Sequence, residues 1–313
     1  MSADETRYPP LPTLPAGELD ANPPETRWLV DELWADAGVG LIGGTPKSLK
    51  SWLGLEMATA VATGTPCLGR FAVRSSGPAL VYLAEDALPA VRERLGALCR
   101  ARQLELAALQ VHVITVPTLR LDLEHDFHRL VATVKALQPR LLVLDPLVRL
   151  HRANENDAGE IATILGRLRA VQRTLGVAIV LVHHARKQGS ARQLGQNLRG
   201  SGDLHAWGDS NLYLTRDRLG LRLVAEHRAS PAPQPLYLRL ADGTPHLVIY
   251  TPDSERPQPL EERIVAALRE ASAPLPRTHL RNRLAINNQR LGQALKRLEQ
   301  LGAIRRTSAG WTL

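Results

Sequence analysis

Residues 43–51 read Gly-Gly-Thr-Pro-Lys-Ser-Leu-Lys-Ser and join the apolar run VGLIGG to the helical pattern WLGLEMATAVATG. The stretch matches G-x-x-x-x-G-K-[ST] at Gly44, Lys50 and Ser51, but Leu49 stands where the second glycine belongs. Backbone N–H groups at a helix start bind phosphate, the lysine reaches the terminal phosphates, and the serine hydroxyl binds Mg²⁺. The stretch therefore predicts a strand, a phosphate-binding loop and a helix.

The predicted nucleotide contacts extend over this loop and its flanks. The candidate residues are Gly43, Gly44, Thr45, Pro46, Lys47, Ser48, Leu49, Lys50, Ser51 and Trp52. A helical conformation at Leu49 would tolerate the side chain if it turned toward the sheet, and Lys47 adds a second cation to the loop. The alternative is an ordinary turn between a strand and a helix that happens to contain Lys-Ser.

A second glycine pattern lies just upstream, where Gly38, Gly40 and Gly43 form G-x-G-x-x-G. A dinucleotide-binding turn follows a strand, opens a helix, and has an acid about 20 residues later. Here the pattern lies on the strand itself, and the helix begins only near Lys50. No acid stands at the required distance in a strand context. We therefore reject NAD as the ligand.

Short apolar runs alternate with helical patterns along the next part of the chain. The runs ALVYLA, VHVITV, LLVLDPL and VAIVLVHH are separated by patterns such as ALPAVRERLGALCRAR and AGEIATILGRLRAVQRTLG. Continuous apolar strands between helices are typical of a mostly parallel sheet that is covered on both faces. After residue 208, four strand patterns follow one another and predict antiparallel strands that extend the sheet at one edge. The predicted fold class is therefore α/β.

Composition divides the chain into four parts. Residues 1–27 contain six prolines among polar residues, which predicts a disordered arm. Residues 28–250 form the α/β domain, and residues 251–259 (TPDSERPQP) have the composition of a linker. Residues 260–313 carry ten Lys or Arg against four Glu, a net charge of +6 in a chain whose total is +8. This balance favours nucleic acid as a partner, with ordinary solubility as the alternative.

The remaining composition bears on the compartment. Two cysteines, Cys67 and Cys99, are too few for a disulfide framework, which favours a reducing cytoplasm. The chain does not open with a basic and then apolar signal, and its apolar stretches fall short of the ~20 residues of a membrane span. We therefore expect a cytoplasmic protein without a membrane partner.

Acidic residues close two of the strand patterns. Asp145 ends LLVLD, and an aspartate at that end of a buried parallel strand can hold Mg²⁺ beside the phosphate loop, unless it caps a helix before Pro146. Glu85 and Asp86 end ALVYLAED. A carboxylate there can accept a proton from the attacking water, so we assign Glu85 to catalysis and expect Asp86 to cap the next helix. Ser51 and Asp145 are the predicted Mg²⁺ ligands.

Two histidines, His183 and His184, close a fourth strand pattern. A polar side chain at this place can sense the γ-phosphate and transmit its loss to the loop that follows. Hydrogen-bonded surface histidines are the alternative, and zinc is disfavoured because a partner cysteine or third histidine at ligand spacing is absent from the sequence.

The loop that follows, residues 185–203, carries four cations and no acid until its last residue. They are Arg186, Lys187, Arg192 and Arg199. A long basic loop can bind the phosphate backbone of single-stranded DNA. We expect the first three cations to make these contacts. Arg199 can instead reach the ATP of a neighbouring subunit as an arginine finger. A solvated loop is the alternative.

Five motifs in this order, GGTPKSLKS, VYLAED, LLVLDP, VLVHHARK and LRGSGDL, resemble those of the RecA/DnaB-type ATPases related to the plasmid replicative helicase RepA. The resemblance covers about residues 28–250. It implies a RecA-like core, ATP and Mg²⁺ as ligands, and a ring, often a hexamer, with ATP at subunit interfaces. The residues that it implies act in catalysis are Lys50, Glu85, Asp145, His184 and Arg199. The departure at Leu49 affects the expected turnover rate more than nucleotide binding.

Residues 260–313 predict three short helices and a hairpin, the pattern of a winged helix. In the third helix, Leu291, Leu295, Leu298 and Leu301 are expected to face the core. The polar residues left to reach duplex DNA are Asn288, Gln289, Arg290, Gln293, Lys296 and Arg297, with Arg305 and Arg306 on the wing. Docking of another protein is the alternative. RepA-like helicases as usually described lack such a module, so this chain is no simple copy of them.

Three functions compete on these grounds. The first is a DNA-dependent ATPase, such as a helicase or translocase of a plasmid or other mobile element. The second is a DNA-binding regulator or recombination helper in which ATP switches assembly. The third, a metabolic kinase, is disfavoured by the basic C-terminal part and by the lack of an evident small-molecule domain.

Overall fold

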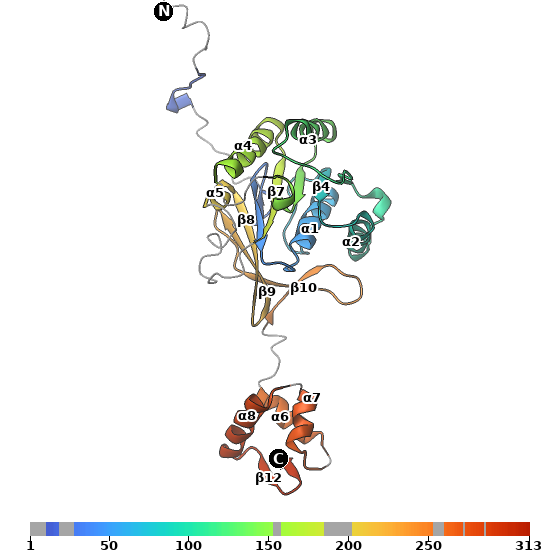
Figure 1. The fold of residues 1–313 in the computed structure, drawn as a ribbon, viewed down its shortest axis with the longest axis vertical. Helices are drawn as coiled ribbons and strands as arrows, with labels where there is room; N and C mark the ends of the chain where they lie inside the picture. Colours follow the sequence, from blue (N-terminus) through green and yellow to red (C-terminus); the bar gives the residue numbers. More distant parts are fainter. Residues whose placement is uncertain are drawn as a thin grey trace, which may run out of the picture. The chain divides into compact units, whose positions relative to one another are not determined.

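A nine-stranded sheet forms the centre of the first part of the chain (Figure 1). Its strands are β3 (Val39–Gly44), β4 (Ala79–Leu83), β5 (Val111–Val113), β6 (Leu141–Asp145), β7 (Ala178–His184), β8 (Ser210–Asp217), β9 (Gly220–His227), β10 (Leu236–Leu240) and β11 (Leu247–Tyr250). Their order across the sheet is β11-β10-β9-β8-β3-β7-β6-β4-β5.

The structure is a computed structural model, and it describes residues 11–18, 28–152, 158–184, 202–252, 260–271, 273–284 and 286–313. The chain divides into two units, Met1–Tyr250 and Thr251–Leu313. Among the described helices, none combines the length and apolarity that a membrane crossing requires. Cys67 and Cys99 are both buried free thiols.

The strands from β8 through β3, β7, β6 and β4 to β5 run parallel to one another. Strands β9, β10 and β11 pair antiparallel and extend the sheet beyond β8. The predicted α/β class with antiparallel edge strands is confirmed. One detail differs: β8, the first strand after residue 208, pairs parallel with β3, because the long connection from β7 can cross over the sheet before β8 begins.

Helices cover both faces of the sheet. On one face lie α1 (Lys50–Thr63) and α2 (Leu88–Ala101), and on the other lie α3 (Glu124–Leu137), α4 (Ala158–Leu175) and α5 (Gly202–Trp207) (Figure 1). Successive strand side chains point to opposite faces, so Leu41 belongs to the second core cluster and Ile42 to the first. Both clusters are built mainly of Leu, Val and Ile, as continuous apolar strand patterns require.

Helix α1 is buried around most of its circumference, which explains why apolar residues occur on all of its sides. It contacts β3, β4, β6 and β7 of the sheet, and also α2. Its one buried acid, Glu56, binds the Leu68 amide at 2.7 Å and the Arg102 guanidinium at 2.5 Å. Through this pair, α1 holds both the following loop and the end of α2.

The upstream glycine pattern serves strand packing. It lies on and just before β3, and α1 starts at Lys50, as the sequence indicates. A Cβ at Gly40 would come within 1.6 Å of the Ser210 carbonyl oxygen. Glycine at position 40 therefore allows β3 to lie against the start of β8.

A short antiparallel pair, β1 (Trp28–Val30) and β2 (Trp34–Ala35), precedes the sheet. Leu29, Leu33 and Trp34 are fully buried in it. These residues extend the first core cluster, and the sequence patterns did not predict these two strands.

The second unit has a core of its own. It consists of α6 (Leu260–Arg269), α7 (Arg277–Leu284) and α8 (Asn288–Gln300), followed by the hairpin β12 (Arg305–Thr307) and β13 (Gly310–Thr312). Its core includes Ile264, Leu280, Leu291, Leu295 and Trp311.

One core prediction for this unit is wrong. Leu291, Leu295 and Leu298 are buried as expected, but Leu301 is 72% exposed. Helix α8 ends at Gln300, so Leu301 lies beyond its last turn and leaves the buried stripe. Ala294 takes the additional place in the core.

Several predicted segments lie wholly or partly outside the described residues. Of the predicted arm, residues 11–18 are described, with a 3-10 helix at Ala16–Glu18. Most of the predicted linker and residues 185–201 of the basic loop are not described. The predictions for Arg186, Lys187, Arg192 and Arg199 therefore lie outside the described residues.

Candidate functional site

Four parallel strands, β3, β4, β6 and β7, end at the same edge of the sheet, and the predicted site residues follow these ends. Leu83 is in register with Asp145 across β4 and β6. Gly43 and Gly44 are in register with His183 and His184 across β3 and β7. The carboxyl ends of neighbouring parallel strands are the usual position of ligand sites in open α/β sheets.

The loop between β3 and α1 turns through two left-handed residues. Lys47 has φ 62°, and Leu49 has φ 64° and ψ 24° at the N-cap position of α1. The expectation of a helical conformation at Leu49 is therefore wrong. The left-handed conformation costs a residue with a Cβ roughly 1–2 kcal/mol, which explains why the motif carries glycine at this place. The Leu49 side chain is half-buried and packs against the core cluster that contains α1.

Gly44 is required by close packing. A Cβ there would lie 2.5 Å from the Leu214 carbonyl oxygen and 2.7 Å from Ser48 Oγ. Ser48 is itself buried, and its Oγ has no hydrogen-bond partner within the part of the chain that the structure describes. A buried hydroxyl without a partner, inside a loop of this kind, suits a phosphate oxygen as its acceptor.

Lys50 lies at the start of α1 and is 5% exposed. Its Nζ donates to the Gly44 oxygen at 3.0 Å and to the Thr45 oxygen at 2.8 Å. Burial lowers the pKa of Lys50 from 10.5 to about 8, and the nearby Asp145 and Glu85 carboxylates oppose that shift. The ammonium is therefore poorly solvated, and its hydrogen bonds go to two neutral carbonyls, which favours its exchange onto an anionic ligand.

Asp145 ends β6 and is 6% exposed. Burial raises its pKa from 3.8 to about 6, a hydrogen bond with Ser51 opposes the shift, and the Asp86 carboxylate adds to it. A 3-10 helix, η3 (Leu147–Arg149), follows with Pro146 as its N-cap, so the alternative role of Asp145 as a helix cap does not hold.

The residues at this place fit Mg²⁺. Asp145 Oδ2 is buried without a hydrogen-bond partner among the described residues, and Ser51 lies beside the same carboxyl. The described residues hold no cluster of three or more His, Cys, Asp or Glu that could enclose a metal. Mg²⁺ is commonly held by only one or two protein oxygens together with substrate phosphates and water, which suits this sparse set.

Glu85 and Asp86 follow β4 and have different partners. Glu85 is 46% exposed on its side chain and accepts from Arg149 Nε at 2.8 Å. Asp86 does not cap α2, because the N-cap is Ala87 without a side-chain bond. Instead, Asp86 accepts two hydrogen bonds from Arg94, at 2.6 and 3.0 Å.

Arg94 of α2 contacts two residues beside the site. Besides Asp86, it lies over the Trp52 ring, with 5.7 Å from its guanidinium carbon to the ring centroid. Trp52 is half-buried and packs against the first core cluster. Sequence spacing carries no signal for Arg94 or for Arg149, since each is paired with an acid only through the fold.

His183 and His184 end β7 beside the phosphate loop. His183 is 1% exposed and His184 is half-buried, so neither is a freely solvated surface residue. Their register with Gly43 and Gly44 brings them to the strand that leads into the loop.

The polar residues predicted for the second unit lie on its surface. Asn288, Gln289, Arg290, Gln293, Lys296 and Arg297 of α8 are exposed, as are Arg305 and Arg306 of β12. Asn287 caps α8 by accepting from the Arg290 amide at 2.9 Å. Arg297 Nη1 lies 3.9 Å from Glu261 Oε1, a long ion pair that leaves the guanidinium largely solvated.

The parallel sheet, the loop at the end of β3, and the lysine, serine and aspartate that meet there define a P-loop ATPase. The chain belongs to the AAA domain family, whose family model matches residues 3–190.

Solved structures agree with this fold. The ATPase domain of G40P has a TM-score of 0.53 at 17% identity, over 69% of this chain and 86% of that one. A DnaB-like replicative helicase, described with its interactions with primase, has a TM-score of 0.55 at 15% identity, over 68% of this chain and 57% of that one. The RadB recombinase has a TM-score of 0.50 at 17% identity, over 69% of this chain and 92% of that one. The predicted RecA/DnaB-type fold is thereby confirmed.

Proposed function

We propose that this chain is an ATP-hydrolysing, DNA-dependent motor ATPase of the helicase type, similar to RepA-like helicases of plasmids or mobile elements. The observation that carries the proposal is the meeting of Lys50, Ser51 and Asp145 at one sheet edge, with Glu85 close enough to act on the pKa of both Lys50 and Asp145. The fold shared with a DnaB-like helicase supports the helicase type.

In this proposal, each residue at the edge has one task. Lys50 leaves the Gly44 and Thr45 carbonyls and binds the terminal phosphates of ATP, where a full positive charge is stabilised. Ser51 and Asp145 hold Mg²⁺, which neutralises phosphate charge when bound. The loop amides and the Ser48 hydroxyl bind the remaining phosphate oxygens.

Glu85 is the proposed general base. Its exposed carboxylate can accept a proton from the water that attacks the γ-phosphate once it turns from Arg149. His184 is proposed to sense the γ-phosphate from the adjacent strand, and Arg199 to stabilise the transition state in a neighbouring subunit. This last role requires a homo-oligomer with ATP between subunits, for which a hexameric ring is the proposed form.

DNA is the proposed macromolecular partner. The cations Arg186, Lys187 and Arg192 would bind the backbone of single-stranded DNA. The second unit, proposed to be a winged helix, would bind duplex DNA through the exposed face of α8 and through β12. The net charge of +6 over residues 260–313 supports this assignment.

The test is ATP turnover with and without single-stranded DNA, together with the mass of the nucleotide-bound assembly. We expect DNA to raise turnover, and Lys50→Ala to abolish it. Lys135→Ala is the matched control, because Lys135 is an exposed lysine of α3 outside the phosphate loop and should retain most activity. A rate that DNA leaves unchanged would contradict the motor, and calorimetry without adenine nucleotide binding would overturn the whole proposal.

A second candidate is an ATP-switched DNA-binding regulator without translocation. It is favoured by one observation, the separate core and basic exposed surface of the second unit. Footprinting separates the two functions. A discrete duplex site that persists without ATP would support the regulator.

A further inference from the structure

One face of the antiparallel strands carries a row of polar and aromatic side chains. The row runs in register across β8, β9, β10 and β11, and its members are Thr215, Arg222, Tyr237 and Tyr250. Directly opposed residues of antiparallel strands place their side chains on the same face of the sheet. The other face of these strands packs in the first core cluster, through leucines such as Leu221 and Leu238.

The two tyrosines lie outside the hydrophobic core. The preceding pair on the same face, Tyr213 and Val224, still packs in the second core cluster. Tyr237 and Tyr250 belong to neither cluster of this unit, and both are half-buried. Part of each ring is therefore accessible, in a position where tyrosines commonly serve binding.

Contacts with the turn between β8 and β9 fix both rings. The Tyr237 hydroxyl donates to Asp217 at 2.9 Å, and the Tyr250 hydroxyl donates to the Leu219 oxygen at 2.7 Å. The two ring centroids are 6.1 Å apart. A Cβ at Gly220 would come within 1.9 Å of the Tyr250 hydroxyl oxygen, so glycine at this turn makes room for the ring. Rings held in this way lose little freedom when a ligand binds.

Cations accompany the rings. The Arg239 guanidinium carbon lies 5.9 Å from the centroid of the Tyr250 ring. Arg239 also forms a long ion pair of 3.7 Å with Asp242, whose carboxylate is fully exposed. Residues 215–222 contain three arginines and one acid, Asp217, which already accepts hydrogen bonds from one ring and from the turn. Aromatic rings combined with positive charge are the means by which proteins bind single-stranded nucleic acid.

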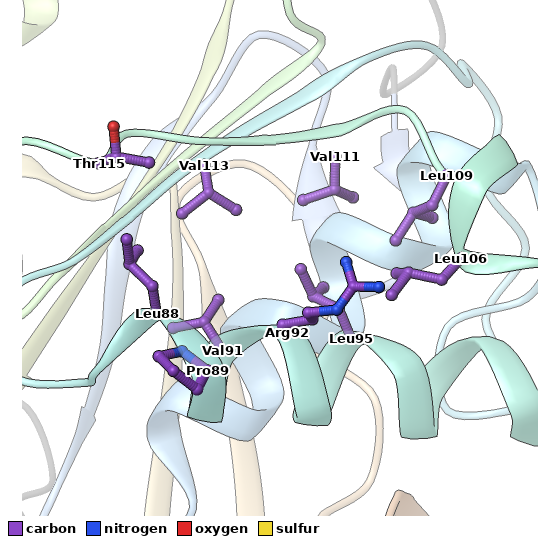
Figure 2. A pocket seen from close by; sticks show the side chains of 10 residues that line it. All are labelled: Leu88, Pro89, Val91, Arg92, Leu95, Leu106, Leu109, Val111, Val113 and Thr115. Atoms are coloured by element: carbon purple, nitrogen blue, oxygen red, sulfur yellow. The ribbon is translucent and has the colours of Figure 1, made fainter.

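An apolar groove between α2 and β5 has a different chemistry (Figure 2). Leu88, Val91 and Val113 line it, and none of its described lining residues is aromatic. Aliphatic side chains offer no ring on which a base can stack. Leu88 is 48% exposed in this groove and therefore provides a control position for substitutions at the surface.

We propose that this face of the sheet binds single-stranded DNA, with bases stacked on Tyr237 and Tyr250 and phosphates close to Arg222 and Arg239. The inference rests on DNA as the partner in the proposed function. It adds a surface whose residues belong neither to the nucleotide site nor to the basic loop or the second unit. Because every base has a flat face, stacking of this kind is tolerant of sequence, and it favours single strands, whose bases are accessible.

Binding of a fluorescent oligothymidine of about 12 nucleotides to the full chain without ATP provides the first test. We expect Tyr237→Ala and Tyr250→Ala each to weaken binding roughly 5- to 100-fold, and the matching phenylalanine variants, which keep the ring, to stay within about twofold. Leu88→Ser is the surface control and should bind like the native protein. Equal affinity of the native protein and both alanine variants would overturn the proposal.

An oligonucleotide with abasic sites provides the second test, because it keeps the phosphates and lacks the bases. We expect the native protein to bind it more weakly than oligothymidine. The double variant Tyr237→Ala/Tyr250→Ala should bind the two oligonucleotides with similar affinity, since it has no ring left to stack on. This comparison does not depend on whether the substitutions perturb the fold. Equal binding of both oligonucleotides by the native protein would overturn stacking.

The outcomes also separate this inference from the proposed function. Binding of single-stranded DNA that is equal in all variants would overturn this surface alone. Binding that depends on the tyrosines, with a turnover that DNA leaves unchanged, would support the surface and contradict the motor. Self-association that depends on Tyr237 and Tyr250 without DNA, measured by sedimentation, would assign this face to a second copy and overturn the inference.

Discussion

Glu85 and Arg149 form an ion pair, with Arg149 Nε 2.8 Å from Glu85 Oε1, although 64 positions separate them in sequence. Arg149 ends the short 3-10 helix that follows Asp145. The Arg149 oxygen accepts from Arg120 at 2.6 Å, which fixes that helix from the other side. The pair therefore links the proposed general base to the segment that follows the proposed Mg²⁺ ligand.

Glu85→Gln should lower kcat by roughly 10²–10⁴-fold, because the amide cannot accept a proton from water. Nucleotide affinity should remain, since Glu85 is not a proposed phosphate ligand. The free energy of unfolding should change by about 1 kcal/mol or less, because both partners of the pair are substantially exposed. Single-turnover hydrolysis, nucleotide titration and urea denaturation measure the three quantities, and unchanged turnover would exclude Glu85 as the base.

Asp145→Asn should stabilise the ligand-free protein at pH 8. The folded-state pKa of Asp145, about 6, lies above the ordinary value of 3.8. The contribution of Asp145 to the free energy of unfolding is therefore greatest below about pH 4 and is lost as the pH rises through about 6. An asparagine stays neutral, and we expect a gain on the order of 1–3 kcal/mol at pH 8 that shrinks toward pH 4. Urea denaturation at the two pH values tests this, and a loss of stability at pH 8 would contradict it.

Mg²⁺-dependent nucleotide binding should weaken as the pH falls below about 6, because a protonated Asp145 cannot bind the metal. Asp145→Asn should remove this pH dependence together with most of the Mg²⁺ effect. Calorimetry of Mg·ATP binding in two buffers of different ionisation enthalpy would also detect the proton released near pH 6. Identical pH profiles for the native and variant proteins would argue against Asp145 as the ligand.

Leu49→Gly should change the free energy of unfolding by less than about 1 kcal/mol. Glycine relieves the strain of the left-handed backbone, which gains roughly 1–2 kcal/mol. It also loses more chain entropy on folding than leucine does, and it removes the packing of the leucine side chain. Leu49→Val should lower the free energy of unfolding by about 1–2 kcal/mol, because a β-branched residue tolerates positive φ poorly. Thermal unfolding of both variants decides this, and a large loss for glycine alone would mean that leucine packing dominates.

Arg102→Ala should destabilise the protein by about 3–5 kcal/mol, because it leaves the buried Glu56 carboxylate without its cation. Glu56 is 2% exposed, and its Oε2 already lacks a hydrogen-bond partner among the described residues. The double variant Arg102→Ala/Glu56→Gln should recover part of the loss. Chemical denaturation of these variants and of Glu56→Gln measures the coupling, and additive losses would show that the pair is energetically independent.

The Arg305→Ala/Arg306→Ala variant should weaken binding of duplex DNA. It should also reduce the slope of log affinity against log salt by about 1 for each DNA phosphate that an arginine no longer neutralises. Turnover without DNA should remain, because both arginines are exposed in the second unit. Binding measured at several salt concentrations provides the test. An unchanged slope would indicate that β12 does not contact the DNA backbone.

Sequence patterns predicted much of the sheet because its strands are buried on both faces and read as unbroken apolar runs. They also predicted that Lys50, Ser51 and Asp145 lie at one edge of the sheet, since the carboxyl ends of neighbouring parallel strands lie at the same edge. They failed where a conformation depends on contacts distant in sequence. The parallel pairing of β8 with β3 is of this kind, whereas the left-handed Leu49 and the pairing of Asp86 with Arg94 are local features that the patterns did not reveal. Leu301 was misplaced because a helical pattern does not show where its last turn ends.

The three core clusters have no member in common, and the third lies wholly within Thr251–Leu313. Each unit can therefore melt as a separate transition on heating. It also means that the small terminal unit can be replaced during evolution without rebuilding the interior of the larger one. A lineage of such chains can thus change the terminal unit while the larger unit is inherited intact.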